Sequence, residues 1–265
     1  MLEMNWKEFL YPYEQVVSEL LVKFNSLNEE YIRRGMYSPI ESVAGRVKSI
    51  SSILEKAAKK NIPMNRIEYE IEDIAGIRIL CPFVEDIEKV INLIRARDGK
   101  DMFIEEERDY ITNIKPSGYR SYHIIVKYPI HTVCGPKEIL AEIQIRTLAM
   151  NFWATTEHTL KYKYSGNIPE ELQERLVYCA EAAFNLDKEM STIREEIMHA
   201  ERLNEIKNNL VTDIIENMHK LYFVLKIDDM DKINTDIARL WEEGNLEELR
   251  SFNEQLEVMT NMYHV

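Results

Sequence analysis

Residues 72–82 read EDIAGIRILCP, and this stretch decides the class of fold. From Ile74 onward the run is apolar and rich in isoleucine, and Pro82 ends it, which predicts a strand that is buried in a sheet. An amphipathic helix is expected directly after this strand, over residues 85–97. The same criteria predict three more strands, over residues 42–48, 121–128 and 139–147. Strands interspersed with helices predict an α/β or α+β sheet domain. Of the two we expect an α+β fold, in which helices flank a mixed α/β-type sheet.

Helices are expected before and after this strand-rich region. An apolar stripe with spacings of three and four predicts a helix over residues 6–31, and Pro12 inside the stripe predicts that the helix begins near Pro12 or bends there. A second helix is expected over residues 50–60. From residue 148 onward the chain is predicted to be helical, and Pro169 is expected to open a long helix.

The last part of the chain differs in charge from the rest. Residues 205–265 contain 13 acidic and 6 basic side chains, a net charge of −7 out of −13 for the whole chain. Three apolar stripes at helical spacing, over residues 210–225, 233–241 and 246–259, predict a set of helices whose apolar faces need a partner. We therefore expect two domains, residues 1–204 and an acidic helical C-terminal extension over residues 205–265. The stripes are expected to pack against the first domain or a neighbouring subunit.

The composition limits the kinds of protein that this chain can be. With 265 residues, of which 45% are hydrophobic and 30% charged, it can bury a full core and stay soluble. A net charge of −13 argues against a general nucleic-acid coat. Three widely separated cysteines, expected to be buried and reduced, and the absence of any apolar run of membrane length favour the cytoplasm, with no membrane association.

The first polar cluster is basic. Residues 45–49 read GRVKS, and Ser52 and Lys56 follow on the predicted helix, on one stripe. A strand that leads cations into a helix N-terminus is typical of a phosphate site. A basic helix face exposed to solvent is the simpler interpretation, and the spacing alone favours it.

The second cluster is the predicted strand of residues 72–82. Asp73 at its start is a natural magnesium ligand, and Arg78 could stack on a base or hold a phosphate. An internal Asp–Arg pair would explain the same two residues.

The third and fourth clusters are a loop and a strand. Residues 110–114 are expected to be extended and residues 115–118 to form a turn, after which Tyr119 could lie flat on a purine while Lys115 and His123 donate hydrogen bonds. A hairpin turn with buried tyrosines is the alternative. In the strand, alternation places three polar side chains, Glu142, Gln144 and Arg146, on one face. That face is either a polar site or simply exposed to solvent.

Together with LAMNFWATTEH at residues 148–158, these four clusters resemble the RelA/SpoT-type (p)ppGpp synthetase domain, and most of all its small single-domain members of the RelQ type. The resemblance covers roughly residues 5–203, with the motifs in the family's order and spacing. It implies transfer of the pyrophosphate of ATP to the 3′-hydroxyl of GTP or GDP, with release of AMP, and a nucleotidyltransferase-like synthetase domain.

The resemblance also implies roles for individual residues. Asp73 would be a catalytic ligand of Mg²⁺, and Glu142 would be the second catalytic carboxylate, as metal ligand or as base for the 3′-hydroxyl. The positions that match the ATP-binding ones are Arg46, Lys48, Ser52, Lys56 and Arg78. The positions that match the acceptor-binding ones are Lys115, Tyr119, His123, Gln144 and Asn151.

Partners and limits follow from the same resemblance. Small members are typically homotetramers, and an alarmone effector and single-stranded RNA are further partners in the family. No hydrolase activity is expected, because none of the six histidines precedes an aspartate. The alternatives are a nucleotide-binding regulator without catalysis, an RNA-binding protein, and a nucleotidyltransferase that releases pyrophosphate.

Overall fold

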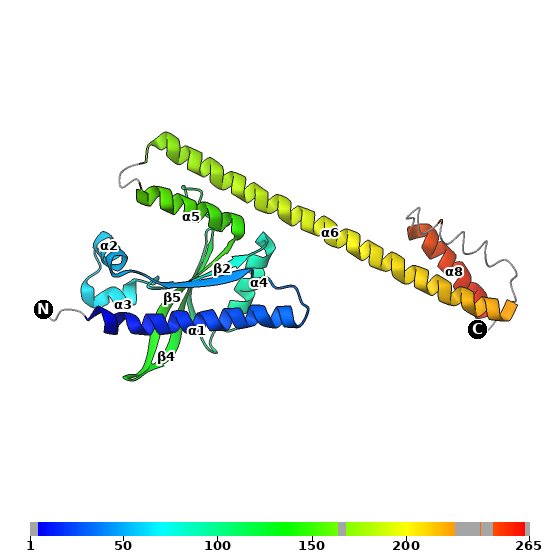
Figure 1. Cartoon of the computed structure of the whole chain (residues 1–265), viewed down its shortest axis with the longest axis horizontal. Helices are drawn as coiled ribbons and strands as arrows, with labels where there is room; N and C mark the ends of the chain where they lie inside the picture. Colours follow the sequence, from blue (N-terminus) through cyan, green and yellow to red (C-terminus); the bar gives the residue numbers. More distant parts are fainter. Residues whose placement is uncertain (1–4, 164–167, 226–238, 240–245, 263–265) are drawn as a thin grey trace. The chain divides into compact units, whose positions relative to one another are not determined.

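The computed structural model describes residues 5–163, 168–225, 239 and 246–262 (Figure 1). The chain divides into two compact units, residues 1–191 and residues 192–265. The predicted domain boundary at residue 204 lies inside helix α6 (Glu170–Leu225), which passes through both units, and it stays a prediction. Among the described helices none is both long enough and apolar enough to cross a membrane.

The described part of the first unit is built on a mixed five-stranded sheet with the order β1-β2-β5-β4-β3. Its strands are β1 (Ser42–Val47), β2 (Ala75–Cys81), β3 (Phe103–Asp109), β4 (Tyr122–Thr132) and β5 (Gly135–Thr147). Only the central pair, β2 and β5, is parallel. The prediction of an α+β fold with a mixed sheet is confirmed, and four of the five strands were predicted.

Two sequence-based predictions near β3 are wrong. The strand itself was missed, because FIEEERD is mostly charged and half of it is exposed at the edge of the sheet. Residues 110–114 are a turn and a bend instead of an extended piece. The carboxylate of Asp109 explains this turn, because it accepts hydrogen bonds from the backbone N–H groups of Ile111 at 2.8 Å and Thr112 at 2.9 Å.

The longer helices follow the predicted periodicities, whereas two short helical segments over residues 64–70 were not predicted. They are α1 (Trp6–Arg33), α2 (Ile50–Lys60), the short η1 (Met64–Arg66) and α3 (Ile67–Glu70), α4 (Val84–Arg95), α5 (Leu148–Lys163), α6 and α8 (Leu246–Met262). Of the two alternatives for Pro12, a helix start near it is wrong, because α1 already begins at Trp6 and continues through the proline, while a bend at Pro12 stays a prediction. Pro12 lacks one helical hydrogen bond, but its ring and the next residue, Tyr13, are buried.

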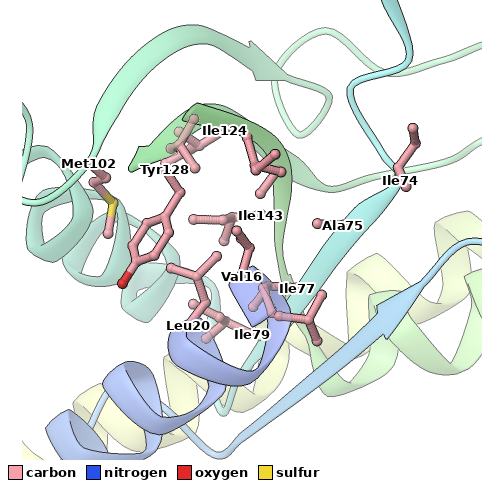
Figure 2. Close-up of a cluster of buried hydrophobic side chains, with 14 of the residues drawn as sticks. Val16, Leu20, Ile74, Ala75, Ile77, Ile79, Met102, Ile124, Tyr128 and Ile143 are labelled. Carbon is pink, nitrogen blue, oxygen red and sulfur yellow. The ribbon is translucent and has the colours of Figure 1, made fainter. Parts of the chain in front are cut away.

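The hydrophobic core lies on one face of the sheet. Odd-numbered side chains of β2 and β5, such as Ile77, Ile79 and Ile143, point into it, and α1 adds Val16 and Leu20 (Figure 2). Burial of each of these side chains contributes roughly 1.5–3 kcal/mol. Because strand side chains alternate, the even-numbered residues of β2 and β5 point to the opposite face, where the polar motifs gather.

In the described part of the second unit, α6 and α8 pack against each other. Ile214 and Met218 of α6 form a small core with Leu249 and Leu256 of α8. A hydrogen bond of 3.2 Å joins the side chains of Asn217 and Asn253 beside it. Residues of the first and third apolar stripes of the tail therefore cover each other. The expectation that the stripes pack against the first domain or a neighbouring subunit stays a prediction. The second stripe, residues 233–241, falls almost wholly outside the described residues.

The predicted burial of the cysteines is only partly right. Cys81 is buried in the core, where burial raises the pKa of its thiol, whereas Cys134 and Cys179 are exposed free thiols.

Candidate active site

Strand register brings the predicted motifs together on the face of the sheet opposite the core. In the β2–β5 pair Gly76 stands opposite Glu142 and Arg78 opposite Gln144, while Arg46 of β1 stands opposite Gly76. These pairs explain why residues from positions 46 to 144 of the sequence line one site.

Asp73, just before β2, is held by two lysines. Lys48 Nζ donates to its Oδ2 at 2.9 Å, and Lys56 Nζ donates to its Oδ1 at 2.8 Å. Ser49 caps α2 and so orients the helix that carries Lys56. The two lysines therefore point into the site, so Lys48 and Lys56 do not belong to a basic face exposed to solvent. Asp73 pairs with these lysines and not with Arg78, so the alternative of an internal Asp–Arg pair is wrong.

Asp73 is ionised at neutral pH. Burial raises the pKa of this carboxyl, but the hydrogen bonds and charges of Lys56 and Lys48 lower the pKa by a larger amount. The pKa of Asp73 therefore lies below its ordinary value.

Glu142, in the middle of β5, is buried and bonded on both oxygens. His123 Nδ1 of the adjacent strand β4 lies 3.0 Å from Oε1, and Gln144 Nε2 donates to Oε2 at 2.6 Å. Burial raises the pKa of Glu142, whereas His123 and Gln144 lower it below its ordinary value. This carboxylate is therefore also ionised at neutral pH and held in one orientation.

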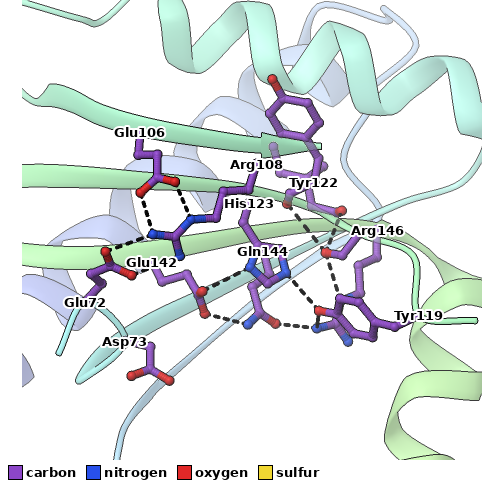
Figure 3. A network of polar contacts seen from close by, with 12 residues as sticks. Glu72, Asp73, Glu106, Arg108, Tyr119, Tyr122, His123, Glu142, Gln144 and Arg146 are labelled. Carbon is purple, nitrogen blue, oxygen red and sulfur yellow. Dashed lines mark hydrogen bonds and ion pairs between the residues drawn. The ribbon is translucent and has the colours of Figure 1, made fainter. Parts of the chain in front are cut away.

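The Glu142 network continues to an aromatic side chain (Figure 3). Tyr119 OH lies 2.8 Å from Nε2 of His123, and Arg146 Nη2 donates to Tyr119 OH at 2.6 Å and to Gln144 Oε1 at 2.5 Å. Arg146 was recognised in the sequence as part of the polar face but was not among the predicted site residues. Its parity with Glu142 and Gln144 was the signal that could have identified it.

The loop that carries Tyr119 is rich in cation–π contacts. Lys115 Nζ lies 3.9 Å from the ring centroid of Tyr110 and 5.0 Å from that of Tyr119. Tyr110, which was not predicted as a site residue, also packs edge-on against His123 with 5.1 Å between the ring centroids. These contacts place two aromatic rings beside a cation, an arrangement suited to a nucleotide base and its phosphates.

A cavity of about 140 Å³ lies on this face between the first two strands and β5. Its lining includes Arg46, Asp73, Arg78, Glu142 and Gln144. Burial lowers the pKa of Arg78, and so do the charges of Arg146 and Arg46. The Nε of Arg78 is buried and makes no hydrogen bond to the described residues. Guanidinium groups that line a cavity from two neighbouring strands are suited to a ligand with a flat ring and phosphates.

Seven of the twelve predicted site residues do not line this cavity. Five of them take part in the contacts described above, namely Lys48, Lys56, Lys115, Tyr119 and His123. Ser52 and Asn151 do not. Ser52 has its hydroxyl 2.9 Å from that of Ser49 at the start of α2. Asn151 lies in the first turn of α5, where its buried Oδ1 has no partner among the described residues. A second ion pair, in which Arg108 of β3 donates two hydrogen bonds of 2.9 Å to Glu72, lies next to the site and was not predicted.

The carboxylate pair suits a magnesium ion. Asp73 and Glu142 are both ionised hard oxygen donors, and the charge of Asp73 acts on Glu142. No cluster of three or more metal-binding side chains occurs in the described part of the chain. Mg²⁺ is usually bound by only one or two protein carboxylates and takes its other ligands from water and substrate phosphates, so two carboxylates are enough for such a site.

This chain is similar to known proteins over the region that carries the site. The family profile described as "Region found in RelA / SpoT proteins" matches residues 45–167. Over 196 residues the chain is 55% identical to the GTP pyrophosphokinase YjbM of Bacillus subtilis, covering 74% of this chain and 92% of that protein. It is also 38% identical to the GTP pyrophosphokinase YwaC of the same organism, over 73% of this chain and 92% of that protein.

Solved structures agree. Small alarmone synthetase 1 from Bacillus subtilis bound to its product pppGpp matches with a TM-score of 0.70 and 55% identity, over 73% of this chain and 98% of that one. A GTP pyrophosphokinase family protein from Streptococcus pneumoniae matches with a TM-score of 0.70 and 50% identity, over 75% and 97%. The chain belongs to the RelA/SpoT family. Within that family it is similar to the small alarmone synthetases, which it covers over almost their whole length.

Proposed function

We propose that this protein is a (p)ppGpp synthetase, which transfers the pyrophosphate of ATP to the 3′-hydroxyl of GTP or GDP and releases AMP. The observation that carries the proposal is the pair of ionised carboxylates on one sheet face, with Asp73 between two lysines and Glu142 held by His123. Relatives named as GTP pyrophosphokinases support the reaction. The absence of a His-Asp dipeptide from the sequence supports a synthetase without hydrolase activity.

ATP would bind at the basic side of the site. Arg46 and Arg78 line the cavity from neighbouring strands and would hold the adenine between them. Lys48 and Lys56 already touch Asp73 and would turn to the phosphates, with Ser52 at the start of α2 beside them. A structure of small alarmone synthetase 1 bound to AMPCPP supports this half of the proposal.

The acceptor would bind at the aromatic side. Tyr119 would stack on the guanine, and Lys115, which lies between two tyrosine rings, would meet the acceptor phosphates. Gln144 and Asn151 would add polar contacts. His123 was predicted to touch the acceptor, but both of its ring nitrogens have protein partners, so we assign it the orientation of Glu142 instead.

The reaction asks for little covalent chemistry from the protein. The 3′-oxygen of the acceptor attacks the β-phosphorus of ATP, and the bond from that phosphorus to the oxygen shared with the α-phosphate breaks, so that AMP leaves. Glu142 takes the proton of the 3′-hydroxyl, and the lysines and arginines neutralise charge that develops on the transferred group. Asp73 and Glu142 would hold Mg²⁺, which supplies further charge neutralisation on these phosphates when it is bound.

Three further properties belong to the same proposal. We place the enzyme in the cytoplasm, as a homotetramer of the kind that the resemblance implies, with an alarmone as an effector. We also propose that residues 1–204 form the synthetase unit and residues 205–265 an accessory helical unit. Single-stranded RNA is a further proposed partner, and salt-dependent RNA binding that survives the loss of Asp73 would support it.

The test uses ATP labelled at the γ-phosphate, Mg²⁺ and either GTP or GDP, with an Asp73→Asn variant beside the wild type. Label on the guanine nucleotide, equimolar AMP and a silent variant would support the proposal. Release of free pyrophosphate would instead identify a nucleotidyltransferase. If the wild type transfers nothing, even with added alarmone, the chain is a nucleotide-binding regulator and the proposal fails.

A further inference from the structure

The loop of residues 115–120, which we call the acceptor loop, is fastened to helix α6. Gly118 has φ +83°, and a Cβ atom at this position would lie 2.6 Å from Cβ of Ala180 on α6. Such a contact is closer than real carbon atoms tolerate, so only glycine allows the loop to approach the helix this closely. Tyr119, the next residue, packs against the small cluster of Trp153, Ala154 and Ala180.

The buried side chain of Arg120 holds the acceptor loop against α6. Its side chain is 3% exposed, and its Nη1 donates to the backbone oxygens of Gly118 at 3.3 Å and Ala180 at 3.4 Å. Its Nη2 donates to the carboxylate of Glu181. Its guanidinium carbon lies 4.4 Å from the ring centroid of Phe184, one turn further along α6. One side chain therefore contacts both the loop and the helix.

Because Arg120 is the neighbour of Tyr119 in the sequence, its contacts with α6 also affect the position of Tyr119. Arg120 directly follows Tyr119, whose hydroxyl meets His123 and Arg146 on the site face. The side chain of Arg120 goes the other way, to α6. If the Arg120 contacts loosen, the loop loses its attachment to the helix while the strands beneath Glu142 keep their own pairing. Loss of this attachment should therefore affect the acceptor and not ATP.

We propose that Arg120 is a positioning residue for the acceptor nucleotide, and that the carboxylate of Glu181 on α6 fixes it in place. The proposal rests on the function proposed above, because it takes Tyr119 as the residue that stacks on guanine. It makes the first part of α6 a determinant of acceptor affinity, although no residue of α6 is expected to touch either substrate.

The geometry also indicates which residue to change. Arg120 is buried, and its replacement would leave the Gly118 and Ala180 carbonyls without a donor and endanger the fold. Glu181 is more than half exposed, with 57% of its side chain accessible, so Glu181→Gln removes the charge and keeps the size. Glu189→Gln, an exposed position on the same helix two turns further on, makes the same change in net charge and serves as the control.

The experiment measures, for the full-length wild type and both variants, KM for ATP and for GDP, the Kd for GDP, the thermal midpoint, and hydrogen exchange of the amides of residues 115–120. We expect Glu181→Gln to raise the KM and Kd for GDP by about three- to tenfold, since the pair is charge-assisted but partly exposed. Exchange in the acceptor loop should become faster, while KM for ATP, the thermal midpoint and all values of Glu189→Gln stay near the wild type.

Two results would overturn the proposal. One is a Glu181→Gln variant that matches Glu189→Gln in GDP binding and in loop exchange. The other is an equal loss of ATP and GDP affinity with a lower thermal midpoint, which would mark Glu181 as merely structural. If the wild type has no transferase activity, the proposed function fails by itself, and loop exchange and GDP binding still decide whether Glu181 holds the acceptor loop.

Discussion

His123 Nδ1 lies 3.0 Å from Glu142 Oε1, while the other ring nitrogen of His123 lies 2.8 Å from the hydroxyl of Tyr119. One imidazole thus joins the buried carboxylate of β5 to the aromatic residue of the acceptor loop. In the proposed reaction these two residues would hold the 3′-hydroxyl and the guanine base of the same nucleotide. His123 therefore sets the distance between Glu142, the proposed general base, and Tyr119, the residue proposed to stack on the acceptor guanine.

Replacing His123 by glutamine should lower kcat and change its pH dependence. Burial would still raise the pKa of Glu142, but the hydrogen bond and charge of His123 that lower it would be lost. The carboxylate would then need a higher pH to ionise, so the acid limb of the kcat profile should move to higher pH, with kcat roughly 10- to 100-fold lower near neutrality. Rapid-mixing single-turnover rates from pH 5 to 9 measure this. An unshifted acid limb would contradict the assigned role of His123.

The Asp73 cluster should stabilise the fold in a pH-dependent way. The pKa of Asp73 is lowered in the folded state, so its stabilising contribution is present above the unfolded pKa of about 3.9 and is lost as pH falls through the folded value. The free energy of unfolding of the wild type should therefore exceed that of Asp73→Asn by a constant amount above about pH 5, and the difference should shrink below about pH 4. Urea unfolding over this range measures both. A difference that grows on acidification would refute the lowered pKa.

Lys56→Gln should weaken ATP binding selectively. Lys56 points into the site and touches Asp73, whereas Lys59 on the same helix is exposed. Loss of one phosphate-binding cation should raise KM for ATP roughly tenfold and leave KM for GDP unchanged. Lys59→Gln removes the same charge from the exposed side and should behave like the wild type. Equal effects of the two variants would mean that only the overall charge of the helix matters.

Gly118→Ala should separate the acceptor loop from α6. The added methyl group meets Ala180 at 2.6 Å and the backbone must keep φ +83°, so we expect a loss of about 1–3 kcal/mol in the free energy of unfolding and weaker GDP binding. Gly35→Ala is the matched control, because Gly35 has φ +65° but no atom within 4 Å of its added carbon. The difference between the two variants isolates the contact with Ala180. If both behave alike, backbone strain alone explains the loss.

A chain that ends at residue 204 should keep the synthetase activity. The apolar stripes of residues 210–221 and 249–256 form a core whose described residues are all distinct from those of the sheet core, so we expect kcat and both KM values to stay near those of the full chain. Steady-state kinetics and light scattering of the two forms test this. A loss of activity together with a change in oligomeric state would place residues 205–265 in the assembly of the enzyme.

The sequence by itself determined those helices and strands whose apolar pattern shows which of their faces is buried. The run from Ile74 to Pro82 could be recognised as a buried strand, and α2 was predicted with its observed bounds, because apolar periodicity reflects which face of an element is covered. Alternation along β5 likewise predicted that three polar side chains share one face of that strand. These inferences need no knowledge of neighbouring elements.

Only the tertiary structure decided which residues of other elements contact those faces. The register of β2, β4 and β5 sets Arg78 and His123 on either side of Gln144, and no local pattern encodes that register. β3 was missed because a charged edge strand has no apolar signature. The pair Arg120–Glu181 joins residues 61 positions apart in the sequence. Pairings of this kind depend on how whole elements pack, so the fold class and motifs followed from the sequence, whereas the partners within the site did not.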